Sequence, residues 1–557
     1  MSKTSSATGA AASEFQPKLL TVLREGYGMR DLRADAFAGL TVAIVALPLS
    51  MAIAIASGVG PERGLYTTIV GGFLVSLLGG SRFQVGGPAG AFIVLVAACV
   101  MTIGLEGLLL ATFLSGFMLI GVGALRLGTY IKFIPYPVTV GFTTGIAVII
   151  FASQIKDLFG LTLPGGEPAE IVPKLAALWS SRETVTSAAV AVALVTVLVI
   201  LGAKRWRPHW PGMLIAVILA AVAVAGLSLP VETIASRFGE LPRVLPAPAL
   251  PGISGEAVWA ALPWAISFTL LGAIESLLSA VVADGMTGRQ HRSNAELVAQ
   301  GVANIGASIF GGFCVTGTIA RTATNVRAGS RGPVSGMLHA VFVLGFMLVA
   351  APLAGFIPLA ALAGVLAVVA WNMAEKEELW ALVRATRGDA MVVLVTFGLV
   401  VFRDLTEGII VGVALGGAVF IRRMSEAARV DHDEPSGRYD PADATDPGMV
   451  VCHLRGPYFF GAAARLGSVL DRIADRPQAF VVDFADVPFI DSSGARSFEV
   501  LARKTARKGG LLYFVRVNDE VRGMLEKHGL TEGHLRYRPD IAAVEAERGM
   551  AAGRESP

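Results

Sequence analysis

The sequence predicts an α-helical integral membrane protein that carries a small α/β domain at its C-terminal end. Of the 557 residues, 54% are hydrophobic and only 16% are charged, which is far from the composition of an ordinary soluble domain. Uncharged runs long enough to cross the hydrocarbon core of a bilayer recur through the first three quarters of the chain. Beyond about residue 448 the apolar runs shorten to the length of strands and alternate with helical patterns.

The first 34 residues are predicted to be a cytoplasmic tail. Met1 to about Gln16 is small and polar, without the pattern of a signal peptide, and we expect it to be disordered. The following stretch, "KLLTVLREGYGMRDLRAD", is typical of an interfacial helix. Because basic residues favour the cytoplasmic side, the N-terminus is expected there; the residues concerned are Lys18, Arg24, Arg30 and Arg33. The string "IRRMSEAAR" after the last span gives the same orientation for the C-terminal part.

Residues 35–425 are predicted to form the transmembrane part. The clearest spans are Leu40–Ser57, Ala188–Ala203, Met213–Leu229 and Met391–Val401. The net charge of +3 is too small to indicate nucleic-acid binding. Three cysteines, at positions 99, 314 and 452, have neither a disulfide nor a metal-ligand spacing, so they are interpreted as packing residues, and no metal or cofactor is expected.

Two places in the membrane part resemble each other and are too interrupted to be plain spans. Gly79-Gly80 is followed by "SRFQVGGPAGAFIVLV", and Gly311-Gly312 by "FCVTGTIARTATNVRAG". Each is a glycine pair, a short extended segment and a helix start, which favours an inverted repeat with two half-helices. Irregular backbone survives in a bilayer only where it is buried in protein or lines a wet cavity. The alternative is that these glycines simply allow tight helix packing.

The two helix starts predict an anion site. Their free N–H groups and positive dipole ends would face a shared cavity. Arg321 adds a full positive charge, which is costly to bury without an anionic ligand or partner. Its alternative role is that of a snorkelling or ion-paired arginine. The predicted substrate-binding residues are Ala89, Gly90, Ala91, Thr318, Ile319, Ala320 and Arg321.

Glu275 lies within an apolar helical stretch, "LLGAIESLLSAVVADG". A carboxylate at the middle of a span costs on the order of 3 kcal/mol, and burial favours its uncharged form, so it can exchange a proton near physiological pH. Ser279 lies one helical turn along the same face and could hydrogen-bond the substrate or, with Glu275, bind a sodium ion. Alternatively, Glu275 is a protonated residue that only fastens helices together.

The tail is predicted to divide into a linker over residues 426–447, an α/β domain over 448–545 and a disordered end over 546–557. The linker is rich in Asp and Pro. In the domain, "MVVCHLRG", "AFVVDFADV" and "LLYFVRV" read as strands, while "AAARLGSVLDRIAD" and "GARSFEVLARKTARKGG" read as helices. Ser492 and Ser493, in "FIDSSGAR", stand between a strand end and a helix start, where either can cap the helix.

These motifs closely resemble the sulfate permease (SulP) family of anion transporters, from about Asp35 to Val544. The strings that carry the resemblance are "GLTVAIVALPLSMAIAIASG", "GLYTTIVGGF", "GGPAGAF", "GAIESLLSAVVADGMTG", "NAELVAQGVANI", "ARTATNVRAG" and, in the tail, "DSSGA". The resemblance implies fourteen transmembrane segments in two inverted repeats, divided into core and gate domains, followed by a STAS domain. The two half-helices then match "GPAGAF" and "TIARTATN". Glu275 matches the acidic residue of the eighth segment, where glutamate favours proton coupling and aspartate accompanies sodium coupling.

Within this family, "SQIKDLFGL" and "AWNMAE" are most similar to the bacterial branch that carries four-carbon dicarboxylates. That resemblance implies uptake of succinate, fumarate or aspartate through an elevator-like movement, in a dimer in the bacterial inner membrane. Animal members have glutamine where this chain has Leu49, so chloride or oxalate chemistry is not transferred. The resemblance also implies that Ser492 or Ser493 is a phosphorylation site.

Three classes of function are compatible with an intramembrane anion site: a secondary carrier, a channel or exchanger of the same fold, and an intramembrane enzyme. The enzyme class is the weakest, because the chain has no HExxH, GxSxG or phosphate-binding GxxxxGK[ST] motif. A buried titratable Glu275 favours the carrier over the channel. Sulfate or bicarbonate symport, driven by protons or sodium, is the alternative to dicarboxylate uptake.

Overall fold

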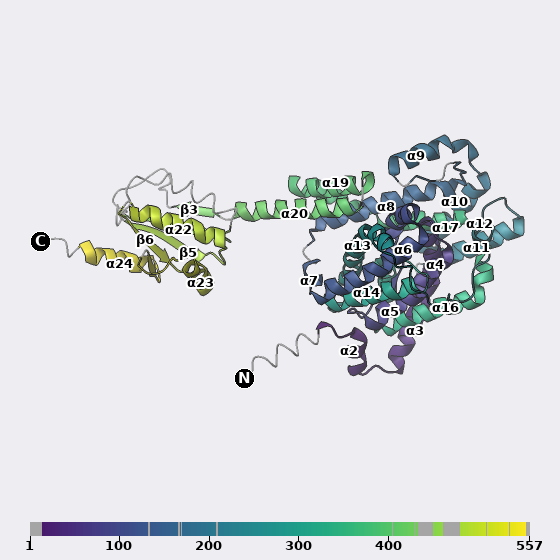
Figure 1. Ribbon diagram of the computed structural model, residues 1–557, viewed down its shortest axis with the longest axis horizontal. Coiled ribbons are helices and arrows are strands. Elements are labelled where there is room, and N and C mark those ends of the chain that lie inside the picture. The colour runs from purple at the N-terminus through teal and green to yellow at the C-terminus, as the bar shows by residue number, and fades with distance from the viewer. Residues whose placement is uncertain are drawn as a thin grey trace. The chain divides into compact units, whose positions relative to one another are not determined.

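The computed structural model describes residues 14–131, 134–164, 167–168, 170–207, 210–403, 405–427, 429–432, 449–459, 479–507, 509–533 and 535–552. The chain divides into two compact units, Met1–Ala414 and Leu415–Pro557 (Figure 1). The first unit is almost entirely helical, and the second contains a five-stranded sheet with helices.

The first half of the helical unit contains α2 (Lys18–Arg24), α3 (Met29–Ala56), α4 (Pro61–Tyr66), the π-helical turn η1 (Thr67–Gly71), α5 (Gly72–Leu78), β1 (Gly86–Gly87), the 3₁₀ turn η2 (Gly90–Phe92), α6 (Ile93–Ala124), α7 (Gly128–Ile131), α8 (Tyr136–Phe159), α9 (Ile171–Ser180), η3 (Arg182–Thr184), α10 (Ser187–Trp206), α11 (Gly212–Leu227) and α12 (Ile234–Phe238). The second half contains α13 (Gly255–Thr287), α14 (Ser293–Ile309), β2 (Thr316–Gly317), α15 (Ile319–Arg327), α16 (Val334–Ala354), α17 (Leu359–Met373), α18 (Lys376–Ala385) and α19 (Arg387–Phe402). The next helix, α20 (Leu405–Ala427), begins in this unit and contains the boundary between the two units.

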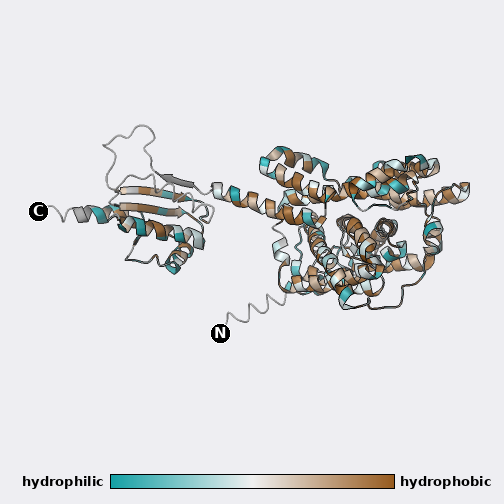
Figure 2. Cartoon of the chain, turned by 45° about the horizontal axis from the view of Figure 1, so that its top comes forward, coloured by the Kyte–Doolittle hydropathy of each residue, from teal (hydrophilic) through white to brown (hydrophobic). Residues whose placement is uncertain are grey.

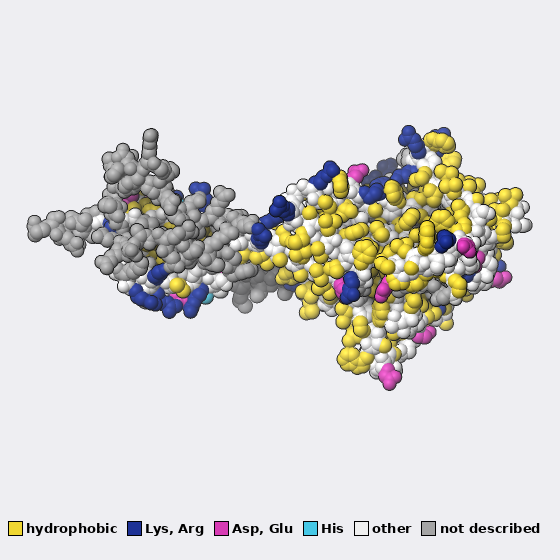
Figure 3. Space-filling view, turned by 90° about the horizontal axis from the view of Figure 1, so that it is seen from above, with side chains coloured by type: hydrophobic (Ala, Val, Ile, Leu, Met, Phe, Trp, Pro, Cys, Tyr) yellow, Lys and Arg dark blue, Asp and Glu magenta, His cyan; other side chains and the backbone are white. Residues whose placement is uncertain are grey.

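Among the described residues, eight helical stretches are long and apolar enough to cross a membrane. They are Met29–Ala56, Gly90–Ala124, Tyr136–Phe159, Ser187–Trp206, Gly255–Thr287, Val334–Ala354, Leu359–Ala385 and Leu405–Ser425. Fourteen segments result when Gly90–Ala124 is divided at its non-helical residue, Gly104, and the broken or shorter α4–α5, α11, α14, α15 and α19 are included. Hydrophobic residues are frequent along these helices (Figure 2), and hydrophobic side chains are spread over the face of the helical unit shown in Figure 3.

The long helices pack in two groups. In the first, α6 packs against α13 and α14, while α16 packs against α3 and α5. In the second, α8 packs against α17 and α19, while α10 packs against α11 and α17. Glycines permit close crossing of α6 and α14: a Cβ at Gly301 of α14 would lie 2.4 Å from the carbonyl oxygen of Gly116 of α6. The grouping brings the two broken segments and α13 into one group.

The N-terminal stretch forms two helices, whereas the sequence predicts one interfacial helix. The break falls between Arg24 and Met29, where Gly26 has a φ of 98°. That conformation is unfavourable for residues with a side chain and ends α2. The chain then continues into α3 without a further break, so Met29–Ala34 belong to the first long helix.

The second unit is an α/β domain whose sheet has the order β3-β4-β5-β6-β7. Its strands are β3 (Arg429–His432), β4 (Met449–Arg455), β5 (Ala479–Asp486), β6 (Leu511–Val515) and β7 (Arg536–Arg538), and its helices are α22 (Ser492–Arg507), α23 (Asp519–Lys527) and α24 (Ile541–Ala552). Strand β3 is antiparallel to β4, and the remaining pairs are parallel. Alternate residues of β5 enter two different hydrophobic clusters, so the sheet is covered on both faces.

Two predicted boundaries of the tail are wrong. Strand β3 lies within the expected linker. The sequence did not predict it, because four residues with one apolar side chain, Val430, give too weak a pattern for a strand. Helix α24 extends to Ala552, although a disordered end was expected from residue 546. The predicted helix "AAARLGSVLDRIAD" lies outside the described residues, as do residues 433–448 of the linker.

The start of α22 also differs from the prediction for Ser492 and Ser493. The helix begins at Ser492, so the capping position is Asp491, and its Oδ1 accepts a hydrogen bond of 2.7 Å from the N–H of Gly494. A carboxylate is as effective a capping group as a hydroxyl, and its negative charge also interacts favourably with the positive end of the helix dipole. Both serines are exposed in the first turn.

Candidate functional site

The two broken segments meet each other directly. Strands β1 and β2 form a two-stranded antiparallel ladder, in which Gly86 lies opposite Gly317 and Gly87 opposite Thr316. The N–H of Thr318 donates to the carbonyl of Val85 at 3.1 Å, which continues the ladder by one bond. Segments some 230 residues apart in the sequence therefore satisfy each other's backbone groups, as irregular backbone inside a membrane protein must. The expectation that the two breaks adjoin is confirmed.

A helix starts immediately after each of the two strands. Ala89 has an extended conformation and precedes η2, which continues into α6; Thr318 is likewise extended and precedes α15. Ala89, Ala91 and Thr318 are buried, Gly90 and Ile319 are half-buried, and Ala320 is exposed. Neither helix start has a side-chain cap. The first N–H groups of both helices are thus available to an anion.

Arg321 lies in the first turn of α15 and is only 1% exposed. Its Nη2 donates to Ser50 Oγ at 3.0 Å, and its Nη1 donates to Thr68 Oγ1 at 3.3 Å. The carbonyls of Gly86 and Pro88 lie 3.5 Å from the guanidinium. Nε is buried and has no partner among the described residues. No carboxylate of the described residues lies within 4.0 Å, so the charge of Arg321 is available to neutralise an anion at the adjoining helix starts.

Sequence reasoning missed Ser50 and Thr68. Ser50 follows Pro48 in α3, and its hydroxyl bonds both the carbonyl of Ala46 and Thr68 Oγ1, at 2.6 and 2.8 Å. Thr68 lies in the π-helical turn η1, which interrupts the second segment. These hydroxyls hold Arg321 in place. The π-turn left no sequence signal, whereas a proline followed by a serine within a span could have pointed to Ser50.

Glu275 lies on α13 and is 6% exposed. Its carboxylate has no hydrogen-bond or ion-pair partner within the described ranges. The residue beside it, Ser276, accepts a hydrogen bond of 2.7 Å from Gln84 Nε2, just before β1. Ser279, one turn further, donates to Thr322 Oγ1 of α15 at 3.0 Å. Glu275 therefore lies next to two contacts, made by Ser276 and Ser279, that join α13 to both broken segments.

Ser279 is engaged in a different contact from those considered in the sequence. Its hydroxyl is fully buried and donates to Thr322, which itself accepts from the N–H of Val85 at 3.2 Å. The chain of three groups ties α13, α15 and the start of β1 together. The hydroxyl proton of Ser279 is therefore used in a structural contact.

A buried amide network positions the second strand. Asn304 on α14 accepts from the N–H of Val315 at 2.9 Å and donates to the carbonyl of the same residue at 3.1 Å. Gln300 donates to that carbonyl and accepts a hydrogen bond of 3.3 Å from Ser276. The network links β2 to α13 and α14 and gives the buried amides of Gln300 and Asn304 hydrogen-bond partners. Sequence reasoning did not find these residues.

The site therefore combines two uncapped helix starts with the guanidinium of Arg321, which has no carboxylate partner among the described residues, and it adjoins the helix that carries Glu275. Such an arrangement attracts an anion. Within the part of the chain that the structure describes, no group of three or more His, Cys, Asp or Glu side chains could hold a metal ion.

Two family descriptions match the chain. The sulfate permease family matches residues 32–396, and the STAS domain matches residues 440–542. YvdB of Bacillus subtilis (strain 168), a protein named for sulfate transport, is 40% identical over 91% of this chain and 95% of its own length. The bicarbonate transporter BicA of Picosynechococcus is 30% identical over 94% of each chain.

Two solved structures are similar. The structure of SLC26A9 superposes with a TM-score of 0.84 at 20% identity and covers 99% of this chain and 96% of its own, which shows the fold. The transmembrane domain of a cyanobacterial BicA superposes with a TM-score of 0.61 at 30% identity, over 70% of this chain and 98% of its own.

Proposed function

The chain belongs to the sulfate permease family, and from that membership we propose that it is a proton-coupled secondary carrier which takes up a small oxyanion. Membership of the family makes the chain a multi-pass membrane transporter of anions. The proposal further covers the coupling ion, the choice of anion, and a location in the inner membrane with both termini in the cytoplasm.

The observation that carries the proposal is the meeting of the two helix starts at the β1–β2 ladder, with Arg321 behind it. An oxyanion there would accept hydrogen bonds from the N–H groups around Gly90, Ala91, Ile319 and Ala320. Arg321 is bonded to neutral hydroxyls and carbonyls, so its charge would attract the anion electrostatically without a direct hydrogen bond. Its contact with the carbonyl of Gly86 would also help to position β1.

Glu275 is the proposed coupling residue. An anion that enters a low-dielectric cavity disfavours a second negative charge nearby, so anion and proton should bind with positive coupling. Because its carboxylate has no fixed partner among the described residues, Glu275 can gain and lose a proton without breaking a structural hydrogen bond. Sodium, bound by Glu275 and Ser279, is the alternative coupling ion.

The substrate candidates come from two sources. The sequence resemblance favours the dicarboxylates succinate, fumarate and aspartate. The names of YvdB and BicA instead suggest sulfate or bicarbonate. All share oxygen atoms that carry negative charge, which is what two helix N-termini recognise.

For transport, we propose an elevator-like movement of one helix group relative to the other. The group that contains the site would move, and the group formed by α8, α10, α11, α17 and α19 would stay in place. The α/β unit is proposed to support dimerisation or regulation. The exposure of Ser492 and Ser493 would admit a kinase at this position.

The deciding experiment is uptake of labelled anions into proteoliposomes that contain the full-length protein. A panel of succinate, fumarate, aspartate, sulfate and bicarbonate is tested with a proton gradient, a sodium gradient or neither. Accumulation above equilibrium under the proton gradient supports a proton-coupled carrier. Anion movement that never exceeds equilibrium under either gradient would identify a channel or exchanger, and accumulation under sodium alone would replace the coupling ion.

A further inference from the structure

A second group of charged and aromatic side chains lies outside the anion site, at the C-terminal end of α10 and along the end of α17 and α18. We call it the basic aromatic patch. Its members are Lys204, Arg205, Trp206, Arg207, Trp371, Lys376, Trp380 and Arg384, all of which are exposed. The three indole rings are exposed by 82%, 64% and 57% in chain order, although tryptophan is usually well buried.

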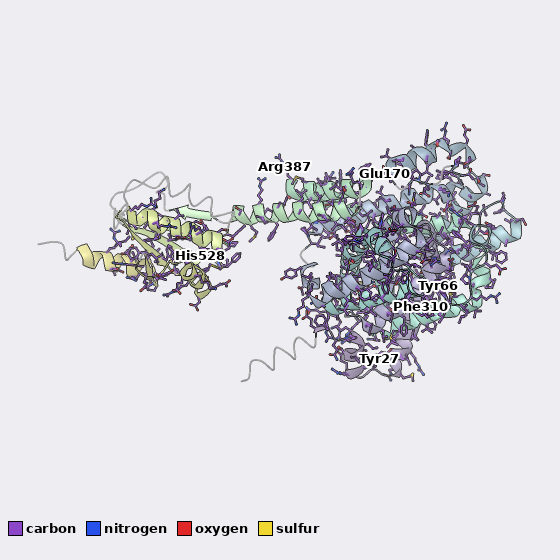
Figure 4. The ribbon with its side chains drawn as sticks, in the orientation of Figure 1. Tyr27, Tyr66, Glu170, Phe310, Arg387 and His528 are labelled. Atoms are coloured by element: carbon purple, nitrogen blue, oxygen red, sulfur yellow. The ribbon has the colours of Figure 1, made fainter. Side chains whose placement is uncertain are left out.

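The segments of this patch are joined to each other. Lys204 Nζ donates to Asn372 Oδ1 at 3.3 Å, which links the end of α10 to the end of α17. Helices α10 and α17 also pack along their length. Helix α18 begins four residues after Asn372 and continues the patch, and Arg387, labelled in Figure 4, follows it at the start of α19.

Two cations are fixed over tryptophan rings. Lys376 Nζ lies 4.2 Å from the ring centre of Trp371 and donates to the backbone carbonyl of the same residue at 2.7 Å. Arg384 Cζ lies 4.3 Å from the ring centre of Trp380. A cation above an exposed indole places a positive charge and an amphipathic ring at one level, which is the arrangement that suits a lipid headgroup above acyl chains.

The charge of the patch is open to a ligand. Within the described residues, no carboxylate lies within 4.0 Å of Arg205, Arg207 or Arg384. Three glutamates, at positions 375, 377 and 378, lie at the N-terminus of α18, where the helix dipole offsets part of their charge. The end of α10 contributes the consecutive basic and aromatic residues Lys204–Arg207, with no acidic residue among them.

The opposite end of α10 differs. There Arg182 lies 5.2 Å from the ring centre of Trp179, beside the acidic residue Glu183. Because α10 is long enough to cross the bilayer, its two ends face different leaflets. The concentration of unpaired cations at one end indicates that this end meets negative charge in its own leaflet.

We propose that the basic aromatic patch binds an anionic phospholipid, with the phosphate between Arg205, Arg207 and Lys376 and the acyl chains against the exposed apolar side chains of α10. Leu194, Leu198 and Leu201 are exposed along that helix and continue the patch into the hydrocarbon region. Basic residues at a membrane surface each favour anionic lipid, so several together suffice for a preference over zwitterionic lipid.

The test uses full-length protein in a neutral detergent and the quenching of tryptophan fluorescence by brominated phosphatidylglycerol or brominated phosphatidylcholine. The wild type should bind the phosphatidylglycerol at least about tenfold more tightly. The double variant R205Q/R207Q should lose most of that preference while its thermal unfolding midpoint in detergent alone is unchanged, because neither side chain has a partner in the described structure. The matched control is R182Q, which removes a cation beside a tryptophan at the other end of α10 and should keep the preference.

Three results would overturn the proposal. Equal affinity of the wild type for both lipids would show that the patch is an ordinary interfacial belt. If R182Q and R205Q/R207Q lose the preference for phosphatidylglycerol to the same extent, the preference arises from overall charge rather than from this patch. Competition by free glycerol phosphate at concentrations equal to those of the lipid would assign the patch to a soluble phosphate compound instead, since a lipid site also needs the acyl chains.

Discussion

The guanidinium of Arg321 lies so close to Gly87 that a methyl group on Gly87 would come within 2.0 Å of Nη1. The arginine is on α15 of the second repeat, and the glycine is on β1 of the first. Their contact therefore joins the two repeats at the point where both helix starts face the proposed anion. It also explains why the first break contains glycine at this position: only a residue without a side chain leaves room for the guanidinium.

Gly87→Ala is expected to impair the protein through this contact. The added methyl group must displace either β1 or Arg321, at a cost of about 1–3 kcal/mol. Both the yield of folded protein and the rate of anion uptake should fall. Gly121→Ala on α6 is the matched control, because a Cβ there has no atom within 4 Å and should leave both measurements unchanged. Wild-type uptake by Gly87→Ala would contradict the packing described here.

Arg321→Ala should weaken anion binding by a few kcal/mol at most, since it removes a buried charge beside the site. It should also lower stability, because Ser50, Thr68 and two carbonyls lose their donor. The measurements are substrate affinity by isothermal titration and the thermal unfolding midpoint. Arg327→Ala, in the exposed last turn of the same helix, is the control. An Arg321→Ala protein that folds and binds its anion with unchanged affinity would remove this residue from the site.

Glu275→Gln mimics the protonated carboxyl group and is expected to separate exchange from accumulation. The variant should bind anion as well as the wild type and exchange it across the membrane, yet fail to accumulate it under an inward proton gradient. Labelled-anion uptake with acid outside, set against a counterflow assay, measures both. Should Glu275→Gln accumulate anion normally, the residue only fastens helices together and the coupling ion enters elsewhere.

The control for that experiment is a second buried carboxylate on the neighbouring helix. Glu296 of α14 is fully buried and accepts a hydrogen bond of 2.9 Å from the N–H of Ser81. Glutamine can accept the same bond. Glu296→Gln should therefore retain driven accumulation, which shows that loss in Glu275→Gln is not a general effect of neutralising a buried glutamate.

Ser279→Ala tests whether this hydroxyl binds an ion or only packs. The substitution removes the donor to Thr322, at a cost of about 1 kcal/mol, while Thr322 keeps its bond from Val85. With proton coupling, driven uptake should continue at a slightly lower thermal unfolding midpoint. A specific loss of sodium-dependent uptake, with proton-dependent uptake unchanged, would instead make Ser279 a sodium ligand.

In the α/β unit, Asp483 is expected to make stability depend on pH. Burial alone raises the pKa of this carboxyl, but hydrogen bonds from Arg516 and His453 outweigh burial and hold the pKa below its ordinary value. A depressed pKa in the folded state stabilises the fold above the pKa of the unfolded chain. That stabilisation disappears as the pH falls through the folded-state pKa.

Hydrogen exchange of the β5 amides in the full-length protein measures this effect. Protection in the wild type, corrected for intrinsic exchange, should decline on acidification. Asp483→Asn should lower protection at neutral pH by an amount that corresponds to about 1–3 kcal/mol and should flatten the decline. Identical pH profiles for the wild type and the variant would show that the Arg516 and His453 contacts contribute no net stability.

The sequence predicted most of the architecture because that architecture depends on local pattern. Runs such as Leu40–Ser57 and Ala188–Ala203 are long and apolar enough to require helices in a bilayer, and the structure has α3 and α10 there. Paired glycines and interrupted hydropathy likewise located both half-helices. Short or weakly apolar elements escaped prediction: β3 has one apolar residue, and the π-turn at Thr68 has a composition like that of any helix.

By itself, the sequence determined that the chain spans a membrane, that two segments are broken, and that Glu275 and Arg321 are charges too costly to bury without a purpose. Each of these follows from the transfer cost of side chains and backbone into hydrocarbon, which is a property of single segments. Only the tertiary structure decided that Arg321 is held by Ser50 and Thr68, that Ser279 bonds Thr322, and that β1 pairs with β2. Those contacts join residues that lie far apart in the chain, and their partners are fixed by helix packing rather than by any local pattern.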